Sequence, residues 1–344
     1  MRTLALLAVL YAAVPARACN VPVFRYALEH WAAEPYPVTL YHRGPLAAAE
    51  LSRIDALEKA SPVRVRFNSI DLATHPDEEQ FASLPWLVVR YPDSSNKAAP
   101  VWQGPLTDDA VAALLDSPKR RDLVQRLLAG DSAVWVLLES GDSTIDDAVT
   151  ARVSADSRRI EGTLKLPVLT KSVEDRIRDD VVPLRLSFSV VRVSRTDPAE
   201  RLLIRMLLGS EPDLDARNGP LLFPVFGRGR ALYALADGGI NEANLSKAAE
   251  FLSGACSCKV KEAHPGVDLL LSADWPTAPE ETTVETTTEP VEVPLPSSKP
   301  KPDTQIAAVT PEGDTTDSPR GWLLGGILGV ALMTLVTGLV WRGR

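Results

Sequence analysis

The chain has 344 residues, of which 45% are hydrophobic, as expected for a globular protein of about two domains and not for a disordered chain. Three cysteines are too few for a small disulfide-built scaffold, and a net charge of −8 argues against a nucleic-acid partner bound through a basic face. Four histidines and three cysteines supply few ligands for a metal enzyme, so we expect no bound metal and no cofactor.

The N-terminus has the pattern of a secretory signal peptide over residues 1–18. A basic second residue precedes an apolar run at 4–14, which is too short to cross a bilayer and is followed by a small-x-small sequence ending at Ala18. Cleavage there would leave Cys19 as the first mature residue. Acylation of Cys19 is an alternative, although a lipoprotein signal has a bulky aliphatic residue where this chain has Ala16.

Residues 276–319 have the composition of a disordered stalk. They contain nine Pro and ten Thr, and six Glu and three Asp against two Lys give a net charge of −7. Such a segment buries too little apolar surface to offset the entropy of ordering it. We therefore expect an extended Pro/Thr/Glu-rich spacer between the folded part and the C-terminal 25 residues.

Residues 320–344 predict a transmembrane helix with a short basic tail. Residues 322–341 carry no charge and are long enough to cross the hydrocarbon core, with tryptophan at each end. Arginines at the very end place the C-terminus in the cytoplasm by the positive-inside rule. With the signal peptide, this predicts a single-pass inner-membrane protein with an extracytoplasmic, periplasmic ectodomain. A processed sorting tag is the alternative interpretation of the span.

The first part of the ectodomain alternates strand and helix patterns. Leu51, Ile54 and Leu57 have helical spacing, whereas residues 63–67 alternate with the period of a strand. The expected order is strand, helix, strand, two strands joined as a hairpin, and a final helix. These elements are predicted at 37–42, 47–60, 63–67, 84–89, 100–104 and from Thr107 onward.

The second part repeats this plan. An apolar run at 133–138 predicts a buried strand, and Asp197-Pro198 predicts a helix start with proline where its missing N–H is harmless. The remaining elements are a helix from Asp146, a strand at 184–193, strands at 219–223 and 231–235, and a helix at 241–253. Apolar stripes are expected at Leu202, Leu203, Met206 and Leu207, and at Leu245, Ala248, Ala249 and Leu252.

Both parts resemble the thioredoxin fold. Thioredoxins carry Cys-Gly-Pro-Cys where the first strand meets its helix, and this chain has Arg-Gly-Pro-Leu at 43–46. They also place a cis-proline before the third strand. Pro85 lies forty residues after Pro45, and Pro220 holds the same place in the second part. The resemblance implies that Pro85 and Pro220 are candidate cis-prolines and that neither part keeps the redox dithiol.

We therefore predict an α/β protein with two tandem, redox-inactive thioredoxin-like domains at 19–130 and 131–275. The expected function is non-catalytic binding or scaffolding of an unknown protein partner at the membrane. A thiol–disulfide exchange or copper-handling protein is the alternative, because Cys256 and Cys258 form a C-x-C pair.

The remaining candidate residues lie in two places. Cys19, Cys256 and Cys258 permit a disulfide between the N-terminus and the end of the second domain, a strained bond within the C-x-C pair, or a soft-metal site. His42 and Arg43 precede a predicted helix start, where an anion is favoured, and are either an anion pocket or a solvated loop pair. No catalytic residue set is recognisable.

Overall fold

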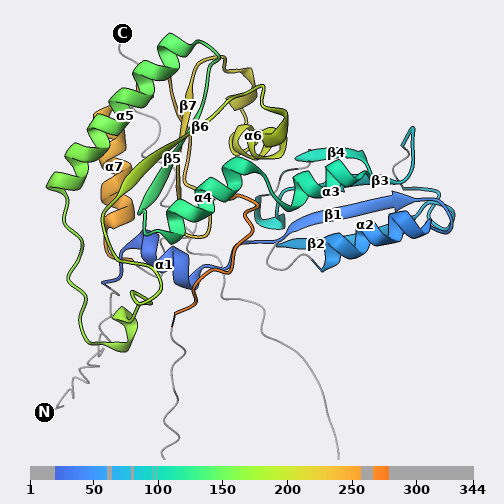
Figure 1. The fold of residues 1–344 in the computed structure, drawn as a ribbon, viewed down its shortest axis with the longest axis horizontal. Coiled ribbons are helices and arrows are strands. Elements are labelled where there is room, and N and C mark those ends of the chain that lie inside the picture. The colour runs from blue at the N-terminus through green and yellow to red at the C-terminus, as the bar shows by residue number, and fades with distance from the viewer. Residues whose placement is uncertain are drawn as a thin grey trace, which may run out of the picture. The chain divides into compact units, whose positions relative to one another are not determined.

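The protein is an α/β structure with two sheets (Figure 1). The computed structural model describes residues 20–59, 64–78, 81–95, 97, 99–256 and 266–278, all within one compact unit. The predicted signal peptide, the stalk beyond residue 278 and the predicted membrane span lie outside the described residues. Within the described part, no helix has the length and hydropathy needed to cross a bilayer.

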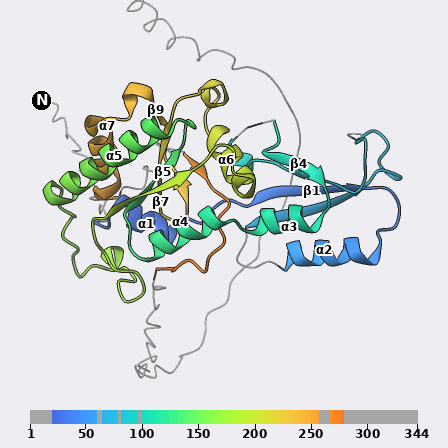
Figure 2. The same cartoon turned by 45° about the horizontal axis from the view of Figure 1, so that its top comes forward.

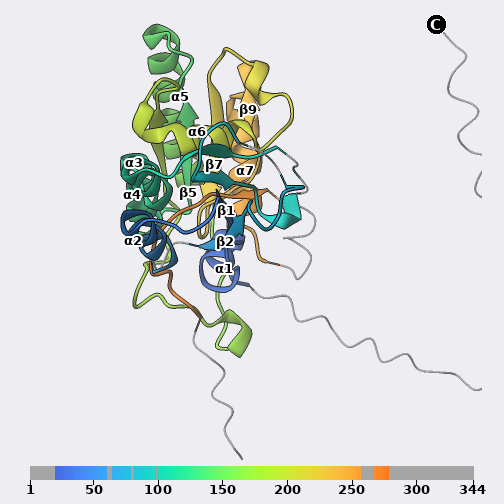
Figure 3. The same cartoon turned by 90° about the vertical axis from the view of Figure 1, so that its right-hand side faces the viewer.

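The first sheet has the strand order β2-β1-β3-β4. Strands β1 (Tyr36–His42) and β2 (Val65–Asp71) are parallel, whereas β3 (Trp86–Val89) pairs antiparallel with β1 and with β4 (Trp102–Pro105). Helices α2 (Ala48–Glu58) and α3 (Asp108–Leu115) contact each other on one side of the sheet (Figure 3). All six predicted elements are present, although β2 overlaps its predicted region, 63–67, only at its start and continues to Asp71.

The alternation of β1 explains how this sheet is covered. Val38 and Leu40 are buried in the core beneath the helices, and Tyr41 packs in a smaller aromatic cluster on the opposite face. Helix α2 packs on the sheet mainly through Leu57, and Leu51 from the predicted stripe is 53% exposed. The buried face of α2 therefore contains fewer of the predicted apolar residues than their helical spacing suggested.

The second sheet has the order β10-β8-β7-β5-β6. Parallel β5 (Ala133–Leu138) and β6 (Phe188–Val193) are followed by antiparallel β7 (Leu221–Phe226), β8 (Arg230–Ala231) and β10 (Val267–Asp268). The short β9 (Leu235–Ala236) also pairs with β7. The path β6-β5-β7-β8 therefore repeats the pairing of β2-β1-β3-β4.

Every residue of β5 and β7 is buried, because helices cover both faces. Helices α5 (Ser143–Thr163) and α7 (Glu242–Ser253) lie together on one face (Figure 1). Helices α4 (Pro118–Leu128) and α6 (Arg201–Leu208) pack on the other through Leu123, Leu203 and Met206. The predicted stripes of α6 and α7 are all buried, which confirms those two predictions.

Two helices were not predicted. Helix α4 begins after Ser117 and is separate from α3. Helix α1 (Val23–His30) precedes the first sheet in the sequence but packs against β7 of the second sheet and against α7 (Figure 2). Backbone pairing of Pro22 with Ala255 joins the start of α1 to the end of α7. The predicted strand at 184–193 is also shorter, starting at Phe188.

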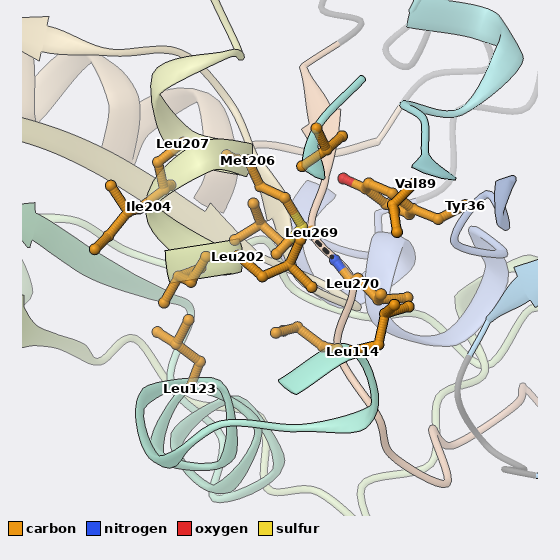
Figure 4. Packing of buried hydrophobic residues seen from close by; sticks show 14 of the residues in the cluster. Tyr36, Val89, Leu114, Leu123, Leu202, Ile204, Met206, Leu207, Leu269 and Leu270 are labelled. Carbon is orange, nitrogen blue, oxygen red and sulfur yellow. Dashed lines mark hydrogen bonds between the residues drawn. The ribbon is translucent and has the colours of Figure 1, made fainter. Parts of the chain in front are cut away.

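One hydrophobic cluster joins the two sheets (Figure 4). Tyr36 and Leu114 enter it from the first sheet and its helix, and Met206 enters from the second. Leu269, Leu270 and Leu271, which follow β10, lie between these contributions and are nearly fully buried. The backbone N–H of Leu270 donates to Met206 Sδ at 3.2 Å. This last described segment therefore contacts both the first-sheet half and the second-sheet half of the structure.

Candidate functional site

The structure places His42 and Arg43 next to each other at the end of β1, but nearby amides are already occupied. The N–H of Gly44 donates to Asp71 Oδ1 at 3.0 Å, and the N–H of Ala47 at the start of α2 donates to Glu50 Oε2 at 2.7 Å. Bonds from the Gly44 and Ala73 N–H groups lower the pKa of Asp71. Carboxylates of the chain itself thus take the place of an external anion.

The two candidate cis-prolines differ. The Leu84–Pro85 bond, immediately before β3, is cis and is the one cis bond among the described residues. The Gly219–Pro220 bond is trans, so the expectation that at least one of the two candidates follows a cis bond is met by Pro85. With this bond trans, the Gly219 carbonyl accepts a hydrogen bond from Arg195 Nη2 at 2.8 Å.

Of the three cysteines, the structure describes Cys256, which is 3% exposed in the core beneath α7. Its N–H donates to the carbonyl of Val21 at 2.9 Å. Cys19 and Cys258 lie outside the described residues. Within the described part, no three His, Cys, Asp or Glu side chains are grouped so that they could hold a metal ion.

A site that sequence reasoning missed is a groove between α3 and the start of α6. Its first hollow, of about 380 Å³, lies between β4 and α3 on one side and the 3-10 turn η3 (Pro198–Glu200) and α6 on the other. The half-buried indole of Trp102 forms one wall. Small or apolar residues form most of the rest, namely Pro105, Ala110, Ala113, Leu114, Pro198, Ala199 and Leu202.

A second hollow, of about 350 Å³, continues along α6 and shares Pro198 and Arg201 with the first. Three arginines line it. Arg195 is held by the carbonyls of Glu139 and Gly219, and Arg205 Nη1 lies 3.9 Å from Asp215 Oδ2. Burial lowers the pKa of Arg195.

Arg201, at the junction of the two hollows, is exposed, and its side chain has no hydrogen bond or ion pair with any residue that the structure describes. The acidic side chains that line the first and second hollows near Arg201 belong to the starts of helical segments. Asp197 caps η3 by accepting from the N–H of Ala199 at 2.9 Å, and Asp109 stands in the first turn of α3. Arg201 is thus the cation that the groove leaves available to a ligand.

The walls of the groove are pinned by a buried polar cluster around Arg120 and Glu200, which we call the junction cluster. Ser117 Oγ donates to Glu200 Oε2 at 2.6 Å and accepts from Arg120 Nε at 3.0 Å. Arg120 also donates to the carbonyls of Ala113, Leu114 and Leu270. Burial lowers the pKa of Arg120 to about 10, which leaves it charged at neutral pH.

Comparison with protein-family models, with curated protein sequences and with solved structures finds no match to this chain. Function is therefore inferred from this chain's own geometry. The junction cluster ties the end of α3, the start of α4 and the start of α6 to the segment after β10. The groove consequently lies between elements held in fixed positions, as a binding site requires.

Two signals for the groove were present in the sequence. Thr107 and Asp197-Pro198 were both recognised as helix starts, and both carry the expected caps in the structure. Their proximity was not predictable, because it depends on how the two halves pack across Leu114 and Leu202.

Proposed function

We propose that this is a non-catalytic binding or scaffold protein, anchored in the membrane, whose ligand site is the groove between α3 and α6. The observation that carries the proposal is the pair of adjoining hollows, one walled by Trp102 and both reaching Arg201. Two adjoining hollows that share Pro198 and Arg201 suit an extended ligand. The fixed walls favour binding without a large rearrangement.

The chemistry of the groove favours an extended peptide segment. An aromatic wall over small residues accommodates proline or aliphatic side chains, as in grooves that recognise extended proline-rich peptides. Arg201 would pair with a carboxylate of the same segment, and guanidinium groups bind carboxylates in a defined geometry. The proposed ligand is therefore a peptide with an acidic residue adjoining an apolar or proline-containing stretch.

The proposed architecture is two thioredoxin-like domains. Support comes from the shared path of a parallel pair followed by two antiparallel strands, and from the cis bond at Pro85 just before β3. The trans bond at Pro220 weakens the likeness of the second half. Function is not transferred with such a fold, because it resides in particular sites.

We also propose that the folded part lies outside the cytoplasm, in the periplasm, with residues 322–341 crossing the inner membrane. The support is the signal-peptide pattern and the apolar span of the sequence. A reporter fused after Ser272 tests this proposal. Export of the reporter is expected, whereas reporter activity confined to the cytoplasm would overturn the topology.

Peptide display on the purified protein tests the binding proposal. We expect selected peptides to carry an acidic residue near proline or aliphatic residues. Arg201→Glu should reduce their affinity at least tenfold, because it reverses the charge at the centre of the groove. Arg152→Glu, at an exposed position on α5, is the matched control and should bind as the wild type does. Equal affinity in both variants would reject the groove.

The alternative function is thiol–disulfide exchange or copper handling through Cys256 and Cys258. An attacking thiolate must be accessible, and Cys256 is 3% exposed, which favours a structural role. The N–H of Cys256 donates to the carbonyl of Val21, so the start of the described chain pairs with the end of α7, and burial of Cys256 leaves Cys258 as the candidate partner of Cys19. We therefore favour a disulfide between Cys19 and Cys258.

Thiol titration before and after mild reduction separates these functions. A structural Cys19–Cys258 disulfide predicts two further thiols after reduction and peptide binding that is unchanged in a Cys258→Ser variant. Disulfide-reductase turnover that is abolished by Cys256→Ser would instead establish the redox alternative.

A further inference from the structure

Four segments that pack around the second sheet meet at the buried guanidinium of Arg25, away from the groove. Arg25 lies on α1 and is 0% exposed. It lines a cavity of about 10 Å³ together with Leu127 and Gly130 at the end of α4, Val182 before β6, and Gly227 after β7. The side chains of Phe24, Leu28 and Asp131 complete the lining.

The packing next to this cavity is otherwise tight. A Cβ atom added to Gly130 would lie 2.8 Å from the carbonyl oxygen of Pro183, and one added to Gly227 would lie 2.7 Å from the Cβ of Ala27. Both glycines also have positive φ, +97° and +58°, which side-chain-bearing residues rarely adopt. The cavity is therefore a local space beside Arg25 and not a sign of loose packing.

The hydrogen bonding of Arg25 is incomplete. Its Nε forms an ion pair with Glu29 Oε1 at 2.7 Å, and that oxygen accepts a hydrogen bond from the N–H of Arg178 at 2.8 Å. Neither Nε nor the terminal nitrogen Nη2 has a hydrogen-bond partner among the residues that the structure describes, and Nη2 has no ion-pair contact either. Burial lowers the pKa of Arg25 and raises that of Glu29. A buried charged donor left unpaired is unfavourable, and native proteins commonly satisfy such groups with ordered water.

We propose that this cavity is a binding site for one structural water molecule, which accepts a hydrogen bond from Arg25 Nη2. A space of about this volume holds a single water molecule and excludes organic ligands and polyatomic anions. A bare anion would lie beside Asp131, and a cation would lie beside Arg25 itself. A water molecule both accepts and donates hydrogen bonds, so it suits a buried guanidinium better than a bare ion of either sign does.

The water site joins elements that are remote in sequence. It connects α1 to the end of α4, to the segment before β6 and to the turn after β7. Helix α1 directly follows the predicted signal peptide and carries its charged pair, Arg25 and Glu29, toward the interior. The water therefore completes the polar contacts that seat this helix on the second sheet.

A crystal structure of the mature full-length chain, at a resolution that shows ordered water, tests the proposal. We expect one density peak within hydrogen-bond distance of Arg25 Nη2. In Arg25→Lys the shorter ammonium group retains Glu29 as a partner but no longer supplies Nη2, so the peak should be lost. Arg126→Lys, at a half-exposed ion pair on α4, is the matched control and should keep the peak.

Oxygen-17 relaxation dispersion provides a second measurement by counting long-lived internal waters. The count should fall by one in Arg25→Lys and remain unchanged in Arg126→Lys. If Arg25→Lys does not fold, the wild-type crystal structure alone decides. An empty cavity, a direct bond from Arg25 Nη2 to a protein atom, or a peak that persists in folded Arg25→Lys would overturn the proposal.

Discussion

Replacing Arg120 by methionine removes the centre of the junction cluster while keeping most of the side chain's apolar volume. Arg120 is 1% exposed and reaches Glu200 through Ser117 Oγ. The variant removes the donor to Ser117 Oγ and leaves the carbonyls of Ala113, Leu114 and Leu270 without their donor. Glu200 keeps its hydrogen bonds from Ser117 Oγ and the N–H of Lys119. A buried polar group left without its partner costs about 1–3 kcal/mol, so the loss of these bonds together should cost at least about 3 kcal/mol. That is a large share of a typical unfolding free energy of about 5–15 kcal/mol.

Urea unfolding of the folded part, followed by circular dichroism, measures this loss. Arg121→Met is the control, because the neighbouring Arg121 is exposed and forms a surface ion pair with Asp116. Such pairs contribute about 0–1 kcal/mol. An Arg120→Met variant no less stable than Arg121→Met would refute the reasoning, because the junction cluster would then not hold the two halves together.

Three further outcomes are expected. Burial raises the pKa of Asp175, but hydrogen bonds from Thr170 and Asn20 outweigh it and lower the pKa to about 2. The charged form of Asp175 therefore stabilises the fold by about 1–2 kcal/mol above about pH 3.9, and this contribution is lost as the pH falls through 2. The urea midpoint of Asp175→Asn should consequently fall less between these pH values than the midpoint of the wild type does. Leu270→Ala should cost about 2–5 kcal/mol in urea unfolding, because the leucine is fully buried between the halves. Tyr91→Phe should cost about 0.5–1.5 kcal/mol by the same assay, because it loses the 2.8 Å bond to the Arg205 carbonyl, and spectrophotometric titration should lose a tyrosine of pKa about 12.

Strong local patterns predicted most of the elements. The apolar run at 133–138 is a fully buried strand, and the stripe through Leu245, Ala248 and Leu252 is the inner face of α7. Thr107 caps α3 as expected, by accepting from the N–H of Ala110 at 3.1 Å. In each case propensity, spacing and capping indicated the same structure, so local sequence was sufficient.

Helix α1 was missed because its interior face contains charge. Arg25 and Glu29 are buried along with Phe24 and Leu28, so hydrophobicity alone does not mark the inward side. Helix α4 was missed because Pro118 starts a new helix at a position where proline is tolerated. Both depend on tertiary contacts that local patterns do not show.

The groove could not be predicted for a similar reason. Trp102 and Arg201 are about a hundred residues apart, and the sequence contains no motif that links them. Their proximity follows from burial of Leu269, Leu270 and Leu271 between the halves, and from the junction cluster. Of the two interpretations of His42 and Arg43, an anion pocket or a solvated loop pair, the pocket meets competing carboxylates, Asp71 and Glu50, whose positions depend on the fold.

Photo-crosslinking in the native membrane tests the central claim, that the groove binds a protein segment. A photo-reactive residue replaces Ala113, an exposed groove residue on α3, in the full-length chain. The same substitution at Ala151, exposed on α5, is the control. The proposal predicts a discrete crosslinked partner from position 113, none from position 151, and loss of the first when Arg201→Glu is added. No partner at position 113, or the same partner at both positions, would contradict it.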